Sequence, residues 1–163
     1  MLEGLYFEDF SPGKQFKTHK RTITEADLIN FMTLCGFFES LFMDQTYAET
    51  ETSFGRRIAP GALSLAYAEG LSILSGIIHH TGMAFLGLEL QIHKPVFIGD
   101  TIGVEIEVID RRETQKPDRG IVTFRHRVIN QKSEAVMDYV VKRMIRRRGG
   151  EKEVPKVGPA STG

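Results

Sequence analysis

The sequence predicts an α+β fold in which about five antiparallel strands surround one long helix. Three observations predict it. Residues 62–78 carry apolar side chains at helical spacing and a single charge, Glu69, and a helix without a charged face is expected to be buried nearly all round. Several later segments alternate apolar and polar residues, as half-buried strands do. The 163 residues suffice for one domain with a sizeable core, which we place at residues 1–148.

Two shorter helices are expected before the long one. Thr24 and Asp27 have the spacing of a capping box, and the helix that they begin ends at Gly36. Residues 44–52 form a second, weaker helical segment, and we expect Asp44 to cap it.

The long helix follows Pro60 and Gly61, and a proline is tolerated in a first turn. Its apolar face is broad, and its opposite face is small and uncharged, with Ser64, Ala68, Ser72 and Ser75. His79 and His80 follow at its far end, where cationic groups are favoured without any metal or catalytic role. The pattern therefore predicts a buried helix that the sheet must cover.

Five strands are expected. They are residues 15–22, 83–93, 101–108, 120–130 and 135–146. The tail, residues 149–163, is rich in Gly, Pro, Lys and Glu, so we expect it to be disordered.

Composition excludes several classes of function. The 21 basic and 21 acidic residues cancel, so no overall field favours nucleic acid or an anionic membrane. A single cysteine, Cys35, excludes an intramolecular disulfide framework and fits a reducing compartment. The first ten residues do not resemble a signal peptide, and residues 62–78 are too short and too polar to span a bilayer. We expect a cytoplasmic protein without metal or cofactor.

Two motifs carry a family resemblance. Residues 36–44 read GFFESLFMD and residues 54–61 read FGRRIAPG. They resemble the G-D-x-N-P-x-H-x-D and A-H-G or A-P-G motifs of the MaoC-like dehydratases, which include the (R)-specific enoyl-CoA hydratases. Residues 7–13, 21–27 and 94–100 resemble further segments of that family in the same order. The chain is identified as a member over residues 5–146, and the resemblance implies a hot-dog fold and an acyl-thioester substrate, with a role in fatty acid metabolism.

The resemblance also shows what has changed. The family adds water across a 2-enoyl thioester with an Asp and a His that hold one water. This chain has Phe37 at the Asp position and Phe42 at the His position, and neither ring can transfer a proton. Glu39 is the carboxylate left inside the motif. It is either a relocated general base or a solvated loop residue.

The second motif keeps its chemistry. The backbone N–H of Gly61 lies at a helix N-terminus, where it is suited to a thioester carbonyl. We expect the substrate-binding residues to lie around it: Phe37, Phe42, Phe54, Arg56, Arg57, Ile58 and Pro60. The two arginines are either partners of nucleotide phosphates or a solvated charge run. Glu69 is expected to be a paired structural glutamate.

Three functions remain open. The first is a hydratase or dehydratase with weak or displaced catalysis. The second is a non-catalytic acyl-CoA binder or a supporting subunit of a hydratase heteromer, and the third is a thioesterase that uses Glu39. Because hot-dog proteins generally dimerise, we expect a homodimer or a hetero-oligomer with a related chain.

Overall fold

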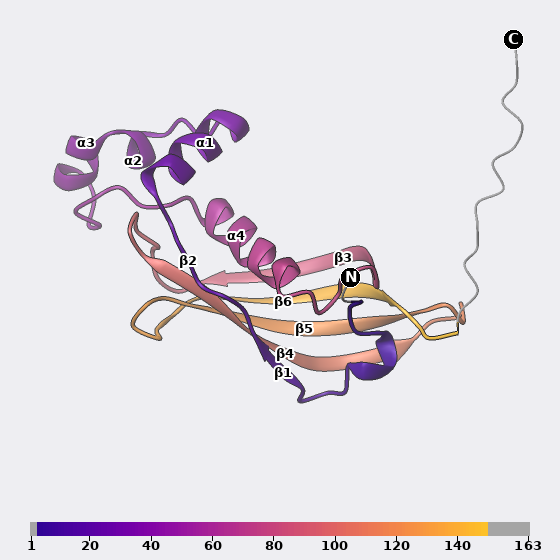
Figure 1. Cartoon of the computed structure of the whole chain (residues 1–163). Coiled ribbons are helices and arrows are strands. Elements are labelled where there is room, and N and C mark those ends of the chain that lie inside the picture. The colour runs from indigo at the N-terminus through magenta and orange to yellow at the C-terminus, as the bar shows by residue number, and fades with distance from the viewer. Residues whose placement is uncertain (1–2, 150–163) are drawn as a thin grey trace, which may run out of the picture.

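A computed structural model describes residues 3–149, which form one antiparallel sheet with a helix along one of its faces (Figure 1). The helical elements are a 3₁₀ turn at Phe7–Asp9, α1 at Glu25–Cys35, α2 at Ser40–Met43, α3 at Gln45–Thr50 and α4 at Gly61–Leu74. The strands are β1 at Gln15–Lys17, β2 at Arg21–Thr22, β3 at Gly82–Ile92, β4 at Thr101–Glu113, β5 at Arg119–Ile129 and β6 at Ala135–Arg146. The predicted α+β class is confirmed. Apart from Gly149, the predicted disordered tail lies outside the described residues.

The sheet has the order β1-β4-β5-β6-β3, and β2 also pairs with β4. It has six strands because the predicted strand over residues 15–22 is divided in two. At the break, the Thr18 hydroxyl accepts a hydrogen bond of 2.9 Å from the Val104 N–H, in place of a backbone carbonyl. β4 runs beyond the predicted end at Val108, through a register shift between Val108 and Asp110. The division and the shift let β4 follow the curvature of the sheet.

The helix α4 is shorter than predicted. It ends at Leu74, and Gly76 adopts the left-handed conformation, with φ of 79°. The apolar pattern continues through Ile77 and Ile78, but these residues lie in turns. The prediction that His79 and His80 lie at the end of this helix is therefore wrong.

The buried side of α4 also differs from the prediction. Leu63 and Leu71 are buried, as expected, but so are Ser64, Ala68 and Ser72 of the small face. These small side chains let the helix axis approach the sheet closely. Two large apolar residues at the end of the helix, Ile73 and Leu74, are instead exposed in the single chain. The prediction that α4 is buried nearly all round is wrong for this chain alone.

The helices α1–α3 gather beyond the N-terminal end of α4 (Figure 1). The predicted capping box of α1 is confirmed, since the Thr24 hydroxyl accepts from the Asp27 N–H at 3.2 Å and Asp27 Oδ2 accepts from the Thr24 N–H at 2.9 Å. Gly36 ends α1 with φ of 73°. Asp44 caps α3 as predicted, accepting from the Tyr47 N–H at 3.0 Å. The sequence did not predict α2.

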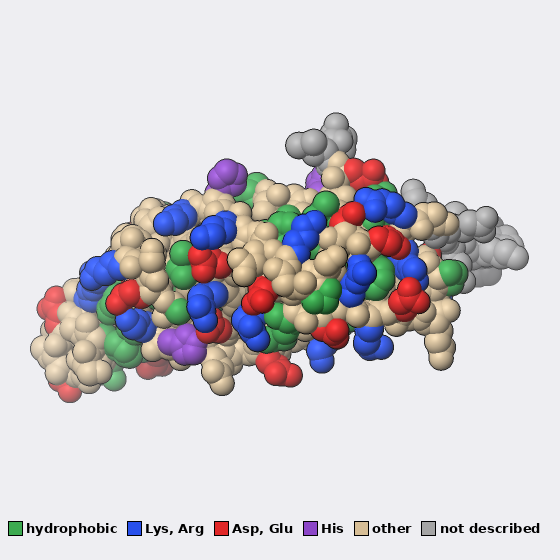
Figure 2. Space-filling model, turned by 90° about the horizontal axis from the view of Figure 1, so that it is seen from below, with side chains coloured by type: hydrophobic (Ala, Val, Ile, Leu, Met, Phe, Trp, Pro, Cys, Tyr) green, Lys and Arg blue, Asp and Glu red, His purple; other side chains and the backbone are tan. Residues whose placement is uncertain are grey.

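The face of the sheet turned away from α4 carries mixed charges (Figure 2). Cross-strand ion pairs account for this pattern: Lys17 with Glu105 at 2.9 Å, Arg125 with Glu107 at 3.2 Å and Arg127 with Asp138 at 3.3 Å. Such exposed pairs each contribute little to stability, but they keep this face polar. Within residues 3–149, no helix has the length and apolarity needed to cross a membrane.

Candidate functional site

A cavity of about 280 Å³ lies at the N-terminal end of α4. Its wall is made by Phe54, Ile58, Ala59, Gly61, Ser64, Ile92, His93, Lys94, Pro95, Val96 and Met137. These residues come from the segment before α4, from α4 itself, from the end of β3 with the turn that follows, and from β6. The cavity thus joins the helix N-terminus to one end of the sheet.

Gly61, the first residue of α4, lies beside Ile92 of β3. A Cβ atom at this position would lie 2.6 Å from Ile92 Cδ1, so any larger residue would require the end of that side chain to shift. The N-cap residue, Pro60, makes no side-chain capping bond, and the first turn of any α-helix has N–H groups without a helical acceptor. The Gly61 end of α4 therefore offers backbone donors and the positive end of the helix dipole to the cavity.

The sheet side of the cavity is a row of cross-strand neighbours. Ile92 on β3 is opposite Met137 on β6, which is opposite Val128 on β5. Directly paired residues of an antiparallel sheet point to the same face, so this row faces α4. Met137 is 1% exposed and forms the buried part of the wall.

The two phenylalanines that replace the family's Asp and His lie near each other in an aromatic cluster. The ring centroids of Phe37 and Phe42 are 6.4 Å apart, and those of Phe31 and Phe37 are 5.2 Å apart. Phe37 remains 38% exposed. Among the described residues, Phe54 and Ile58 line the cavity, whereas Phe37, Phe42 and Pro60 are absent from its wall.

The two arginines of the second motif have partners within the chain. Arg57 forms an ion pair of 2.8 Å with Glu25 of α1, and the Arg56 guanidinium lies 3.9 Å from the centre of the Phe97 ring. Neither lines the cavity as the structure describes it. These contacts hold the segment before α4 against α1 and Phe97.

Glu39 is exposed and precedes α2, where its side chain makes no capping bond. It lies outside the wall of the described cavity. A general base must come within hydrogen-bond reach of the water that it activates. The role of Glu39 as a general base stays a prediction.

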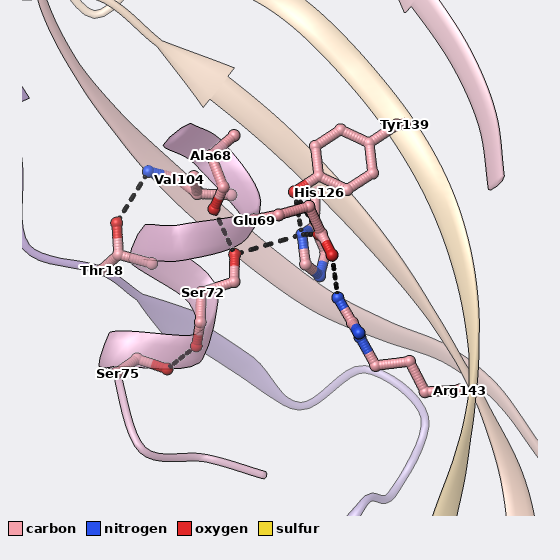
Figure 3. A network of polar contacts seen from close by, with 9 residues as sticks. All are labelled: Thr18, Ala68, Glu69, Ser72, Ser75, Val104, His126, Tyr139 and Arg143. Carbon is pink, nitrogen blue, oxygen red and sulfur yellow. Dashed lines mark hydrogen bonds and ion pairs between the residues drawn. The ribbon is translucent and has the colours of Figure 1, made fainter. Parts of the chain in front are cut away.

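A polar network joins α4 to β5 and β6 (Figure 3). The Tyr139 hydroxyl donates to Glu69 Oε1 at 2.8 Å, and Arg143 donates to Glu69 Oε2. His126 Nδ1 lies 2.6 Å from the Tyr139 hydroxyl and 3.4 Å from the Ser72 hydroxyl. The prediction that Glu69 is a paired structural glutamate is confirmed. Its partners could not be predicted, because β5 and β6 bring them together only through their register.

Burial sets the charge states in this network. Burial, and to a smaller degree the charge of Arg143, lowers the pKa of His126 from 6.5 to about 3. Burial and the Glu69 carboxylate raise the pKa of the Tyr139 hydroxyl. At neutral pH, the imidazole of His126 and the phenol of Tyr139 are therefore both neutral.

The described residues offer no set of side chains suited to binding a metal ion. Over residues 3–149, no group of three or more His, Cys, Asp or Glu side chains is arranged to hold a metal ion. The chemistry available at the cavity is that of backbone N–H groups, the buried Ser64 hydroxyl, apolar side chains, and the His93 and Lys94 side chains with their carboxylate partners.

Comparison with known proteins relates this geometry to a family. Protein MaoC of Klebsiella aerogenes is 37% identical over 115 residues, which are 70% of this chain and 33% of that protein, so the chain spans about a third of its length. The (R)-specific enoyl-CoA hydratase of Aeromonas caviae is 33% identical over 119 residues, which are 73% of this chain and 83% of the hydratase.

The fold has a close structural counterpart. A Mycobacterium tuberculosis protein described as having a double hot-dog fold superposes with a TM-score of 0.78 at 22% identity, covering 98% of this chain and 52% of that one. The predicted hot-dog fold is therefore confirmed. The family model of the MaoC like domain matches residues 9–130, which include Gly61 and the aromatic cluster but end before Met137 of the cavity wall. The chain belongs to the MaoC-like domain family.

Proposed function

We propose that this chain binds acyl thioesters at the Gly61 cavity and catalyses the hydration of enoyl thioesters weakly or not at all by itself. The observation that carries the proposal is that the groups suited to binding the thioester carbonyl are present, whereas the groups that would transfer protons are replaced. An apolar cavity with backbone donors is present at Gly61, whereas two phenylalanine rings occupy the acid and base positions.

The thioester carbonyl is the group that the Gly61 end suits. Hydration of a 2-enoyl thioester places negative charge on this oxygen, and preorganised N–H groups stabilise that charge. The dipole of α4, a helix of 14 residues, acts in the same direction. Binding therefore does not require the lost Asp and His.

Proton transfer is the part that is missing. The Phe37 ring lies between Phe31 and Phe42, so aromatic contacts replace the hydrogen bonds that would hold a water molecule. Loss of a positioned general acid or base costs about 10²–10⁴-fold in rate. The rate of hydration is expected to be reduced to this extent relative to a family member with both groups.

We propose a second hot-dog chain as the partner, either another copy or a related subunit. β3 is an edge of the sheet, and it exposes Met83, Phe85 and Leu86. Ile73 and Leu74 at the end of α4 are also exposed, and Ile73 lines one surface pocket together with Met83 and Phe85. An exposed apolar edge strand that carries no lysine is suited to pairing with another strand. A related subunit with the Asp and His would supply the catalysis that this chain lacks.

The test is a comparison of binding and hydration. Crotonyl-CoA binding to the purified chain is measured by titration calorimetry, and hydration is followed by the loss of enoyl absorbance. We expect binding with little hydration, and a gain of hydration in the Phe37→Asp, Phe42→His double variant. Absence of binding would overturn the proposal.

Two controls separate the alternatives. Rapid hydration by the unmodified chain would assign catalysis to other residues. Acyl-CoA hydrolysis that disappears in Glu39→Ala would favour the thioesterase, whereas unchanged hydrolysis would remove Glu39 from consideration. Sizing chromatography of the chain, alone and mixed with a complete hydratase subunit, distinguishes a homodimer from a heteromer.

A further inference from the structure

We infer that the Gly61 cavity accepts a short acyl chain and that Met137 sets the limit on its length. This inference rests on the proposed binding of thioesters at Gly61. It adds the class of acyl group, which neither the family nor the two phenylalanines determine.

The shape of the cavity indicates its occupant. Its volume of about 280 Å³ lies just below the range of roughly 300–1,000 Å³ that is usual for small-molecule sites. The inner wall is apolar, with Ile58, Val96 and Met137. His93 and Lys94 also line the cavity, but each is paired with a carboxylate, Asp138 at 3.2 Å and Glu134 at 2.8 Å. The cavity is thus suited to a small uncharged hydrocarbon group.

Met137 lies where a longer chain would have to pass. It is a cross-strand neighbour of Ile92, whose Cδ1 lies 2.6 Å from the place that a Cβ at Gly61 would take, so Gly61 and Met137 lie on the same side of the sheet. A thioester whose carbonyl oxygen meets the Gly61 N–H directs its acyl group from α4 toward this wall. The Met137 side chain, 1% exposed, closes the wall.

No space is available behind Met137 on the same strand. Tyr139, two residues further on, points to the same face and is 1% exposed. Its hydroxyl is held by Glu69 and lies 2.6 Å from His126, so the ring is fixed by hydrogen bonds to α4 and β5 (Figure 3). Leaving these groups unpaired would be costly, which prevents the ring from moving aside.

The helix side of the wall is equally closed. Ser64, one turn after Gly61, lines the cavity and is 1% exposed, and its hydroxyl donates to the Pro60 carbonyl at 3.4 Å. Ala68, one turn further, is fully buried. The cavity therefore ends between Ser64 and Met137, so a long acyl chain requires displacement of one of them.

Binding across a series of saturated acyl-CoAs tests this inference, because saturated thioesters bind without reacting. Titration calorimetry with butyryl-CoA and decanoyl-CoA is expected to show at least about tenfold tighter binding of butyryl-CoA, a difference of about 1.4 kcal/mol. Met137→Ala is expected to reduce this ratio by improving decanoyl-CoA binding. Met137→Val, which removes less volume, should show a smaller change of the same sign and protects the test against misfolding of the alanine variant.

Met144→Ala is the matched control. It makes the same substitution on the same strand, but Met144 lies outside the wall of the cavity and its sulfur contacts Arg119. The control should keep the wild-type ratio. Equal affinity of the wild type for both thioesters, or an unchanged ratio in Met137→Ala, would overturn the inference and leave the proposed function intact. Failure to bind either thioester would instead contradict the proposed function.

Discussion

The Tyr139 hydroxyl on β6 donates a hydrogen bond of 2.8 Å to Glu69 on α4, which also accepts from Arg143. This pair joins the helix that carries Gly61 to the strand that carries Met137. The position of the helix relative to the cavity wall thus depends on a partly buried carboxylate.

Glu69→Ala is predicted to destabilise the fold by about 3 kcal/mol. The substitution leaves the Arg143 guanidinium, which is 8% exposed, without its partner, and an unpaired buried charge costs several kcal/mol. Urea denaturation followed by circular dichroism measures the change. Glu49→Ala, at an exposed position of α3, is the control and should remain within about 0.5 kcal/mol of wild type. A loss for Glu69→Ala no larger than that of the control would contradict the assigned role.

Stability is predicted to fall as the pH is lowered from 6.5 toward 3. Burial lowers the pKa of His126 in the folded chain from 6.5 to about 3, so the unfolded chain binds a proton in this interval that the folded chain does not. The contribution of neutral His126 to the free energy of unfolding is fully present above pH 6.5. It decreases by up to about 1.4 kcal/mol per pH unit below that value. Between pH 7 and pH 5, this histidine should account for about 2 kcal/mol.

His126→Asn tests the source of this pH dependence, since its amide can replace Nδ1 without titrating. Denaturation midpoints measured at several pH values should show a weaker slope above pH 5 in this variant. His19→Asn, at an exposed position, should keep the wild-type slope. Identical slopes in His126→Asn and wild type would assign the effect to other groups.

Gly61→Ala is predicted to lower the affinity for butyryl-CoA by at least about tenfold. The added methyl group would lie 2.6 Å from Ile92 Cδ1, so the Ile92 side chain, which lines the cavity, would have to shift. Gly70→Ala on the same helix meets no atom within 4 Å, so it should keep the affinity and stabilise α4 by about 0.5–1 kcal/mol. Calorimetric titration of both variants makes the comparison, and equal affinities would argue against Gly61 as the binding point.

Asp27→Asn is predicted to loosen α1 from α4. Burial opposes ionisation of this side chain, but hydrogen bonds from Tyr67 and Thr24 and the charge of Arg21 outweigh it and lower the pKa of Asp27 from 3.8 to about 2. The Tyr67 hydroxyl, which comes from α4, donates to Asp27 Oδ1 at 2.7 Å. Hydrogen exchange should become faster in Glu25–Cys35 than in wild type while the β5 amides remain protected. Unchanged exchange in α1 would show that other contacts hold it.

Local residue chemistry explains which parts of the fold could be predicted. Thr24, Asp27 and Gly36 fix the ends of α1 through interactions within a few residues, and the sequence displays them directly. The end of α4 was missed because the apolar pattern runs on to Ile77 and Ile78, whereas the conformation of Gly76 ends the helix. The hydrophobic pattern also could not reveal that the serine face packs on the sheet.

Part of the candidate site could be predicted from local sequence, and part could not. Gly61, Phe54 and Ile58 belong to one continuous motif, so the sequence placed them together. Ile92 and Met137 reach the cavity through the pairing of β3 with β6, which depends on register across 45 residues of chain. No local signal marks such residues as part of a site.

Met137 and Tyr139 occupy neighbouring positions on one face of β6 and perform separate tasks. The first limits the space for a ligand, and the second anchors the helix. A change at position 137 can therefore alter which acyl groups fit while the anchor remains intact. This separation gives the lineage a route by which substrate range can diverge through single substitutions, without a compensating loss of the folded state.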